Sequence, residues 1–199
     1  MTEKQWYRYL LEEEVIMVES RQGRELIPCR AEIKDPEINW ETVWRRARLP
    51  GLGPVNVSFL FKILHDLLPT QERVSRTNPA VAGTCRLCES ESLENLEHAL
   101  VTCPANQGTG VAVLDALPTE ARVEGHLALR LQLPVADQVE FPAVWFLSVA
   151  WSNIWGQRCL GNKPELYKVR ADLEAKVSIL RKTRYSVPAI EITSMISRL

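Results

Sequence analysis

The chain of 199 residues carries a net charge of −1, with 24 basic and 25 acidic side chains. This balance excludes a protein that coats nucleic acid over its whole surface, because phosphate neutralisation requires a strong basic excess. A composition of 46% hydrophobic and 25% charged residues is typical of globular rather than disordered proteins. The first eleven residues lack the apolar run of a secretory signal, and no apolar segment reaches the ~20 residues of a membrane span. We therefore expect a soluble, intracellular protein without membrane contact.

The N-terminal 38 residues differ in pattern from the rest of the chain. A short helix is expected at the start, and residues 15–27 suggest a small two-stranded β-ribbon turning near Gly23. From residue 39 onward the pattern is helical. Asn39 can cap a helix that runs from Trp40 to about Arg48, with Trp40 and Trp44 on one face.

The residues after this helix are also helical in pattern. Two prolines and two glycines in residues 50–54 end the first helix. A dense apolar stripe from Phe59 to Leu68 predicts the next helix, and Thr70 can cap another. Weaker helical patterns follow at residues 111–117 and 127–133.

The last third of the chain predicts an antiparallel helical hairpin. Apolar residues recur at helical spacing from Val144 to Trp155 and again from Leu166 to Leu180. Between them, Gly161 can end one helix and Pro164 can begin the next. The fold class is therefore expected to be mainly α-helical. The expected division is into residues 1–38, 39–135 and 136–199.

Three of the five cysteines lie close to one of the three histidines, in the motif Cys85-x2-Cys88-x9-His98-x4-Cys103. Zinc binds four sulfur or nitrogen ligands at tetrahedral corners. A two-residue gap lets the first two cysteines bind from one tight turn, and a short helix over 92–101 can present the histidine before Cys103. We predict one structural Zn²⁺ at this motif. Since four protein ligands leave no position for a substrate, we expect no catalysis there.

Other interpretations of the motif remain open. The cysteines could be reduced core residues beside an unrelated histidine. A disulfide between Cys85 and Cys88 would require an oxidising compartment, which the odd number of cysteines does not support. A nucleophilic pair of Cys103 and His98 would leave two thiols without a role, and an iron–sulfur cluster usually takes four cysteines. The remaining histidines and cysteines are expected to be packed: His65, His126, Cys29 and Cys159.

Basic side chains concentrate in the predicted hairpin. Residues 158–184 hold eight basic and three acidic side chains, a net of +5, whereas residues 85–145 have a net of −6. The hairpin could therefore contact the phosphates of RNA or DNA. It could equally be the solvated face of helices that dock a partner helix. A second basic group, Arg45, Arg46 and Arg48, lies beside tryptophans that we expect in the core. The candidate nucleic-acid residues are Arg158, Lys168, Arg170, Arg181, Lys182 and Arg184.

Together these residues resemble the reverse-transcriptase zinc-binding domain, which follows the polymerase in LINE-type (non-LTR) retrotransposon proteins. The resemblance covers about residues 40–104. It rests on Trp40-x3-Trp44, Phe59-Leu60-Phe61-Lys62, Leu68-Pro69-Thr70, Cys85-x2-Cys88, Glu94-x3-His98 and Cys103.

The resemblance implies zinc ligation by the same four residues and a role in assisting a reverse transcriptase with RNA or DNA. The gap between Cys88 and His98 is longer than in retroviral zinc knuckles, so knuckle-type base recognition is not implied. No aromatic-Ala-Asp-Asp signature is present to hold two catalytic metal ions, and no endonuclease constellation is apparent. We therefore expect a chain without enzymatic activity, similar to the separated tail of such a protein.

Overall fold

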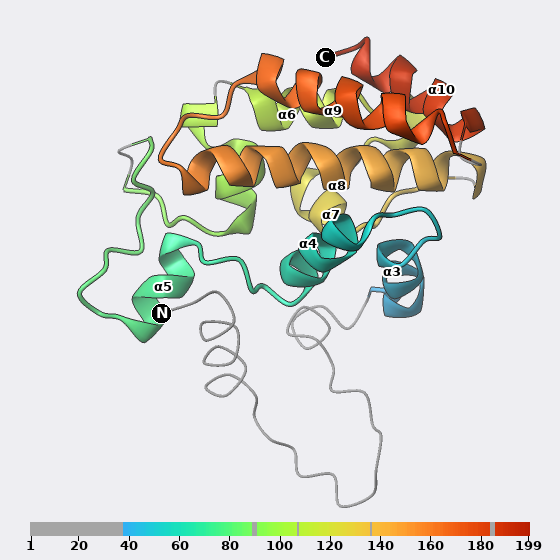
Figure 1. The fold of residues 1–199 in the computed structure, drawn as a ribbon. Helices are drawn as coiled ribbons and strands as arrows, with labels where there is room; N and C mark the ends of the chain where they lie inside the picture. Colours follow the sequence, from blue (N-terminus) through green and yellow to red (C-terminus); the bar gives the residue numbers. More distant parts are fainter. Residues whose placement is uncertain (1–37, 89–90, 107, 136, 184–185) are drawn as a thin grey trace, which may run out of the picture.

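A computed structural model describes residues 38–199, apart from 89–90, 107, 136 and 184–185 (Figure 1). Within this part of the chain the fold is helical, and an isolated bridge between Thr84 and Leu93 is its β-type pairing. The prediction of a mainly α-helical fold is confirmed. The predicted N-terminal helix and β-ribbon lie outside the described residues. None of the described helices is long and apolar enough to cross a membrane.

The first and third of the described helices begin where the sequence predicts, and the second begins five residues before the predicted apolar stripe. α3 (Trp40–Ala47) follows Asn39, whose Oδ1 accepts a hydrogen bond from the Thr42 amide at 3.1 Å. α4 (Pro54–Leu64) begins on its proline and ends earlier than the apolar stripe, because Asp66 adopts a left-handed backbone with φ of 54°. α5 (Gln71–Thr77) is capped by the hydroxyl of Thr70.

Short helices fill the middle of the chain. They are η1 (His98–Thr102), η2 (Pro104–Asn106), α6 (Thr109–Asp115), η3 (Thr119–Ala121) and α7 (Gly125–Leu129). α6 packs directly on η1. A side chain on Gly110 would place its Cβ only 2.4 Å from the carbonyl oxygen of Leu100, so glycine allows this close approach.

α8 (Asp137–Cys159) is the central helix of the molecule. Every residue from 142 to 151 is buried, so the middle of this helix is covered on all sides rather than along the single stripe expected from sequence. The helices α3, α4, α6, α9 and α10 all pack against it. One hydrophobic core therefore joins residues from both sides of position 135, the expected boundary between the second and third segments of the chain.

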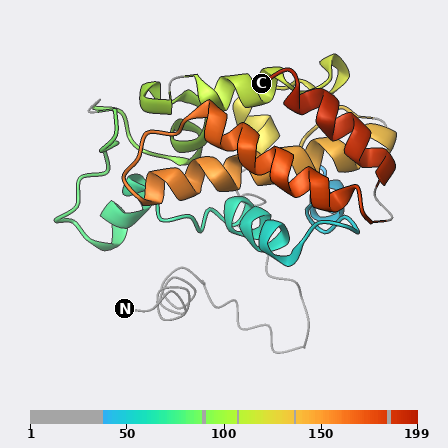
Figure 2. The same cartoon turned by 45° about the horizontal axis from the view of Figure 1, so that its top comes forward.

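The C-terminal region contains one helix more than the predicted hairpin. α9 (Leu166–Leu180) returns along α8 after a turn in which Gly161 has a φ of 73°. α10 (Ser186–Ile196) then packs on both α8 and α9, and the two views in Figures 1 and 2 show the three helices together. The hairpin is thus part of a three-helix bundle.

Candidate metal centre

A short antiparallel pairing closes the loop that carries the first two cysteines. The Cys85 amide donates to the Ser92 carbonyl at 3.1 Å, and the Glu94 amide donates to the Gly83 carbonyl at 2.9 Å. Both ends of the loop are therefore held together. The predicted helix over 92–101 therefore does not begin at residue 92: Leu93 is held in a bridge to Thr84, and the helical residues start only after Asn95.

His98 and Cys103 lie at the two ends of an unusually wide helical turn. The Cys103 amide donates to the His98 carbonyl at 2.8 Å, an i to i+5 bond of the π type. In an α-helix five residues span about 1.4 turns, which would direct the two side chains to different faces. The wider turn brings them toward the same side, while the Asn95 side chain accepts from the His98 amide.

The four predicted ligands meet at one point. Their ligand atoms all lie within 4.8 Å of one another. The sulfurs of Cys85 and Cys103 are 3.7 Å apart, and the Cys88 sulfur is 3.4 Å from Nε2 of His98. Tetrahedral zinc, with Zn–S about 2.3 Å and Zn–N about 2.0 Å, requires S···S of about 3.8 Å and S···N of about 3.5 Å. The site therefore fits one Zn²⁺.

The structure also bears on two of the alternative interpretations, the Cys85–Cys88 disulfide and the unrelated histidine. The three thiols are free, so the structure contains no disulfide between Cys85 and Cys88. The histidine is not unrelated to the thiols, because its ring nitrogen points into their cluster. Among the described residues, this is the one group of Cys, His, Asp and Glu side chains arranged to hold a metal ion.

An arginine from α8 reaches the cluster from the bundle side. Nη2 of Arg158 lies 3.3 Å from the Cys85 sulfur and 2.6 Å from Oε2 of Glu94. Its Nη1 donates to Oδ1 of Asn106 at 3.0 Å. The side chains of Arg158 and Glu94 are 4% and 8% exposed. Our assignment of Arg158 to a nucleic-acid surface is therefore wrong, because a buried guanidinium cannot reach a phosphate.

Burial and neighbouring charges shift the ionisation of these groups. Burial raises the pKa of the Cys85 thiol to about 11, although hydrogen bonds from the Cys88 backbone and Arg158 act in the opposite direction. Burial would lower the pKa of Arg158, but its contacts with Cys103, Cys85 and Glu94 raise it above the ordinary value. Arg158 therefore stays charged beside a sulfur that must lose its proton to bind zinc.

The other candidate nucleic-acid residues that the structure describes lie along α9 and just after its end. Lys168 and Arg170 form ion pairs with Glu165 and Glu174 of the same segment, at 2.6 and 2.9 Å. Arg181 and Lys182 are exposed at the end of α9, and Arg184 lies outside the described residues. A nucleic-acid role for these residues stays a prediction.

The second basic group is a structural feature instead. Arg45 and Arg46 both donate to the carboxylate of Glu140 on α8, and Arg46 is buried. Arg45 and Arg48 are exposed, but Arg45 is held by Glu140, and Nε of Arg48 donates to the Trp44 carbonyl. Arg46 therefore cannot contribute to a surface contact of this basic group.

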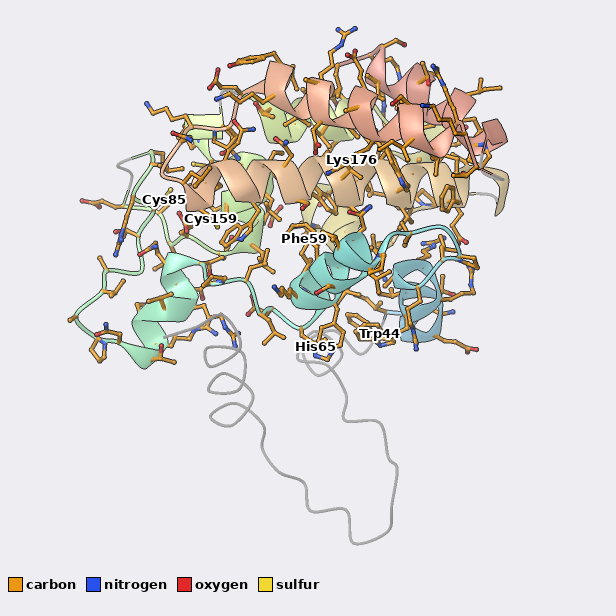
Figure 3. All side chains as sticks on the ribbon, in the orientation of Figure 1. Trp44, Phe59, His65, Cys85, Cys159 and Lys176 are labelled. Atoms are coloured by element: carbon orange, nitrogen blue, oxygen red, sulfur yellow. The ribbon has the colours of Figure 1, made fainter. Side chains whose placement is uncertain are left out.

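The histidines outside the motif differ from each other. His65 packs on Phe61 and Trp44, with ring centroids 4.1 and 5.3 Å away, as expected. Figure 3 shows His65 and Trp44 together, far from Cys85 and Cys159 at the other end of the molecule. The expectation of a packed Cys159 is wrong, because this cysteine is exposed, and Cys29 lies outside the described residues. The expectation of a packed His126 is also wrong. Its side chain is 46% exposed and lies 3.4 Å from the Glu124 carboxylate.

A mainly helical fold with a closed Cys₃His cluster defines a structural zinc-binding module. Residues 29–109 match the family model described as zinc-binding in reverse transcriptase, which confirms the resemblance inferred from the sequence motifs. The match includes all four ligands and ends well before Arg158. Comparisons with curated proteins and with solved structures find no match.

Proposed function

We propose that this chain is a zinc-stabilised module that assists nucleic-acid binding and has no polymerase or nuclease activity of its own. The observation that carries the proposal is the match of residues 29–109 to a zinc-binding domain of reverse transcriptases, enzymes that copy a nucleic-acid template. Four protein ligands saturate tetrahedral zinc, so the metal supports the fold and offers no position to a substrate.

The exposed basic side chains of α9 support a contact with phosphates. Arg170, Arg181 and Lys182 are all exposed. The ion pair of Arg170 with Glu174 is exposed on one helix, and such pairs contribute only about 0.3–0.5 kcal/mol. A phosphate can therefore replace the carboxylate at small cost. Each such contact also releases counterions, which makes binding salt-dependent.

The test is fluorescence anisotropy with labelled single-stranded RNA and duplex DNA, titrated at several salt concentrations. Reversing Arg170, Arg181 and Lys182 to glutamate should lower affinity at least tenfold and make the salt dependence shallower. The matched control reverses Arg48, Arg76 and Arg122, three exposed arginines outside α9, and should have a smaller effect. Absence of binding at low salt would refute the nucleic-acid role. Equal effects of the two variants would refute the location on α9.

A second candidate function is protein interaction through the last two helices. Ile179 on α9 and Ile190 on α10 are 64% and 69% exposed, and the two helices pack side by side. Exposed isoleucines on adjacent helices suit the apolar face of a partner helix. Light scattering that shows concentration-dependent self-association, abolished by Ile179→Asp and Ile190→Asp, would favour this role. It would do so most clearly if no nucleic acid binds.

A further inference from the structure

The buried guanidinium of Arg158 joins the two halves of the ligand set. On one side it contacts the sulfur of Cys85, on the cysteine loop. On the other side it donates to Asn106, whose Nδ2 donates to the carbonyl of Ala99 within the turn that separates His98 and Cys103. A single side chain from α8 thus connects the loop and the wide turn that must come together to bind one metal ion.

The charges around this guanidinium change when zinc binds. Without the metal, Arg158 is neutralised by Glu94, its partner at 2.6 Å. Zn²⁺ with three thiolates adds a net charge of −1 to the same buried region. A buried negative charge is costly unless a positive group or hydrogen-bond donor faces it. The N–H of Arg158 that points at the Cys85 sulfur meets this requirement.

We propose that Arg158 is a positioning residue of the zinc site: it orients the Cys85 sulfur, offsets the negative charge of the zinc–thiolate cluster, and makes metal binding depend on α8. Groups behind metal ligands typically change metal affinity 10–100-fold when they are removed. The complete site consequently extends beyond residues 29–109, the part of the chain that matches the zinc-binding family. The inference concerns the metal site alone and holds whether or not nucleic acid binds.

Glu94 belongs to the same arrangement. Its Oε1 accepts from the Gln71 amide at 3.2 Å while its Oε2 holds Arg158. The carboxylate therefore fixes the guanidinium against the start of α5. Since Glu94 lies four residues before His98 in the sequence, the segment that supplies the histidine ligand also supplies the partner of the arginine.

The test compares Arg158→Gln, Arg158→Lys and Arg86→Gln in the full chain, using zinc competition against a chromogenic chelator. Arg158→Gln should weaken zinc binding about 10–100-fold and speed up zinc release by a thiol-modifying reagent. In the cobalt-substituted protein the thiolate-to-metal absorption band should shift. Arg158→Lys keeps the charge and should restore part of the affinity. Arg86 is exposed beside Cys85 in the sequence, so its variant should behave as wild type.

A double variant covers the case in which the single change prevents folding. Arg158→Gln with Glu94→Gln leaves no unpaired buried charge in the metal-free protein, and it should fold while binding zinc more weakly than wild type. Wild-type zinc affinity and wild-type thiol reactivity in a folded Arg158→Gln or double variant would overturn the proposal. So would an Arg158→Lys variant that is as weak as Arg158→Gln in affinity and spectrum, because the positive charge would then not offset the charge of the zinc–thiolate cluster.

Discussion

Arg46 on α3 and Glu140 on α8 form a buried ion pair, in which Nε of Arg46 donates to Oε1 of Glu140 at 2.8 Å. Nη1 of Arg46 also donates to the carbonyl of Leu131 at 2.6 Å. The more exposed Arg45 completes the arrangement with two bonds to the same carboxylate, at 2.5 and 2.7 Å. This cluster attaches the first described helix to the central one.

Replacing Arg46 with glutamine should destabilise the protein by about 3–5 kcal/mol, because the change leaves the Glu140 carboxylate buried with one partner fewer. The retained contact with Arg45 places the expected value at the lower end of this range. Urea denaturation followed by circular dichroism measures the difference. Arg48→Gln, an exposed change on the same segment, should stay within about 0.5 kcal/mol of wild type. A similar loss of unfolding free energy in both variants would show that the buried ion pair stabilises the protein no more than an exposed arginine does.

The stability of the protein should fall in acid because of Glu140. Burial would raise the pKa of this carboxyl, but Arg45 and Arg46 hold it below its usual value. A pKa that is lower in the folded than in the unfolded state stabilises the fold above the unfolded value of about 4.3, and this contribution disappears as pH falls through the folded value.

Glu140→Gln should therefore be less stable than wild type at neutral pH, and the difference should shrink as pH falls below about 5. Denaturation curves of both proteins across this range provide the comparison. A stability difference that is constant with pH would contradict the assigned role of the carboxylate.

Two glycine-to-alanine changes should have opposite effects. At Gly110 the new Cβ would lie 2.4–2.6 Å from backbone atoms of Leu100 and Val101, which cannot move without separating α6 from η1. We expect a loss of at least about 2 kcal/mol. At Gly156, within α8, nothing lies within 4 Å of the new Cβ, and alanine should stabilise the helix by about 0.5–1 kcal/mol. Thermal unfolding of both variants measures the two changes in stability. A Gly110→Ala variant as stable as wild type would contradict the prediction.

Removing zinc should unfold the cysteine region while leaving the bundle folded. Cys85, Cys103 and Ala105 form a small core with Leu87 and Cys88, separate from the main hydrophobic core. After treatment with a strong chelator, hydrogen exchange should accelerate in peptides covering residues 83–103 but remain slow in α8. Cys88→Ser should show the same pattern without a chelator. Fast exchange throughout α8 would mean that the metal supports the whole fold.

Zinc binding should release protons and weaken in acid. Burial raises the pKa of the Cys85 thiol to about 11, so this thiol is protonated at neutral pH in the metal-free protein. Zinc takes the thiolate, and binding must expel the proton. Titration calorimetry at pH 7 in two buffers with different ionisation enthalpies should report at least one proton released per zinc. Cys159→Ser, an exposed cysteine outside the cluster, should leave the number unchanged. Proton-independent binding would exclude Cys85 as a ligand.

α10 shows why a helix can escape prediction. Its segment, residues 186–196, contains Pro188 and the β-branched residues Ile190, Ile192 and Thr193, which have low intrinsic helix propensity. Packing stabilises it instead, since Ala189, Ile192 and Met195 are fully buried in contact with α8 and α9. Such a helix depends on neighbours that local patterns do not reveal.

The sequence by itself determined the helix starts at Asn39 and Thr70 and the four metal ligands, because caps and metal ligands depend on spacings of a few residues. The tertiary structure alone decided which basic side chains are buried. The carboxylate partner of Arg46 is Glu140, 94 residues away in the chain, and that of Arg158 is Glu94, 64 residues away. Counting charges along the sequence places both arginines on a surface, since it cannot show which side of a helix meets the core. These two arginines form buried ion pairs only because α3 and the cysteine loop pack against α8.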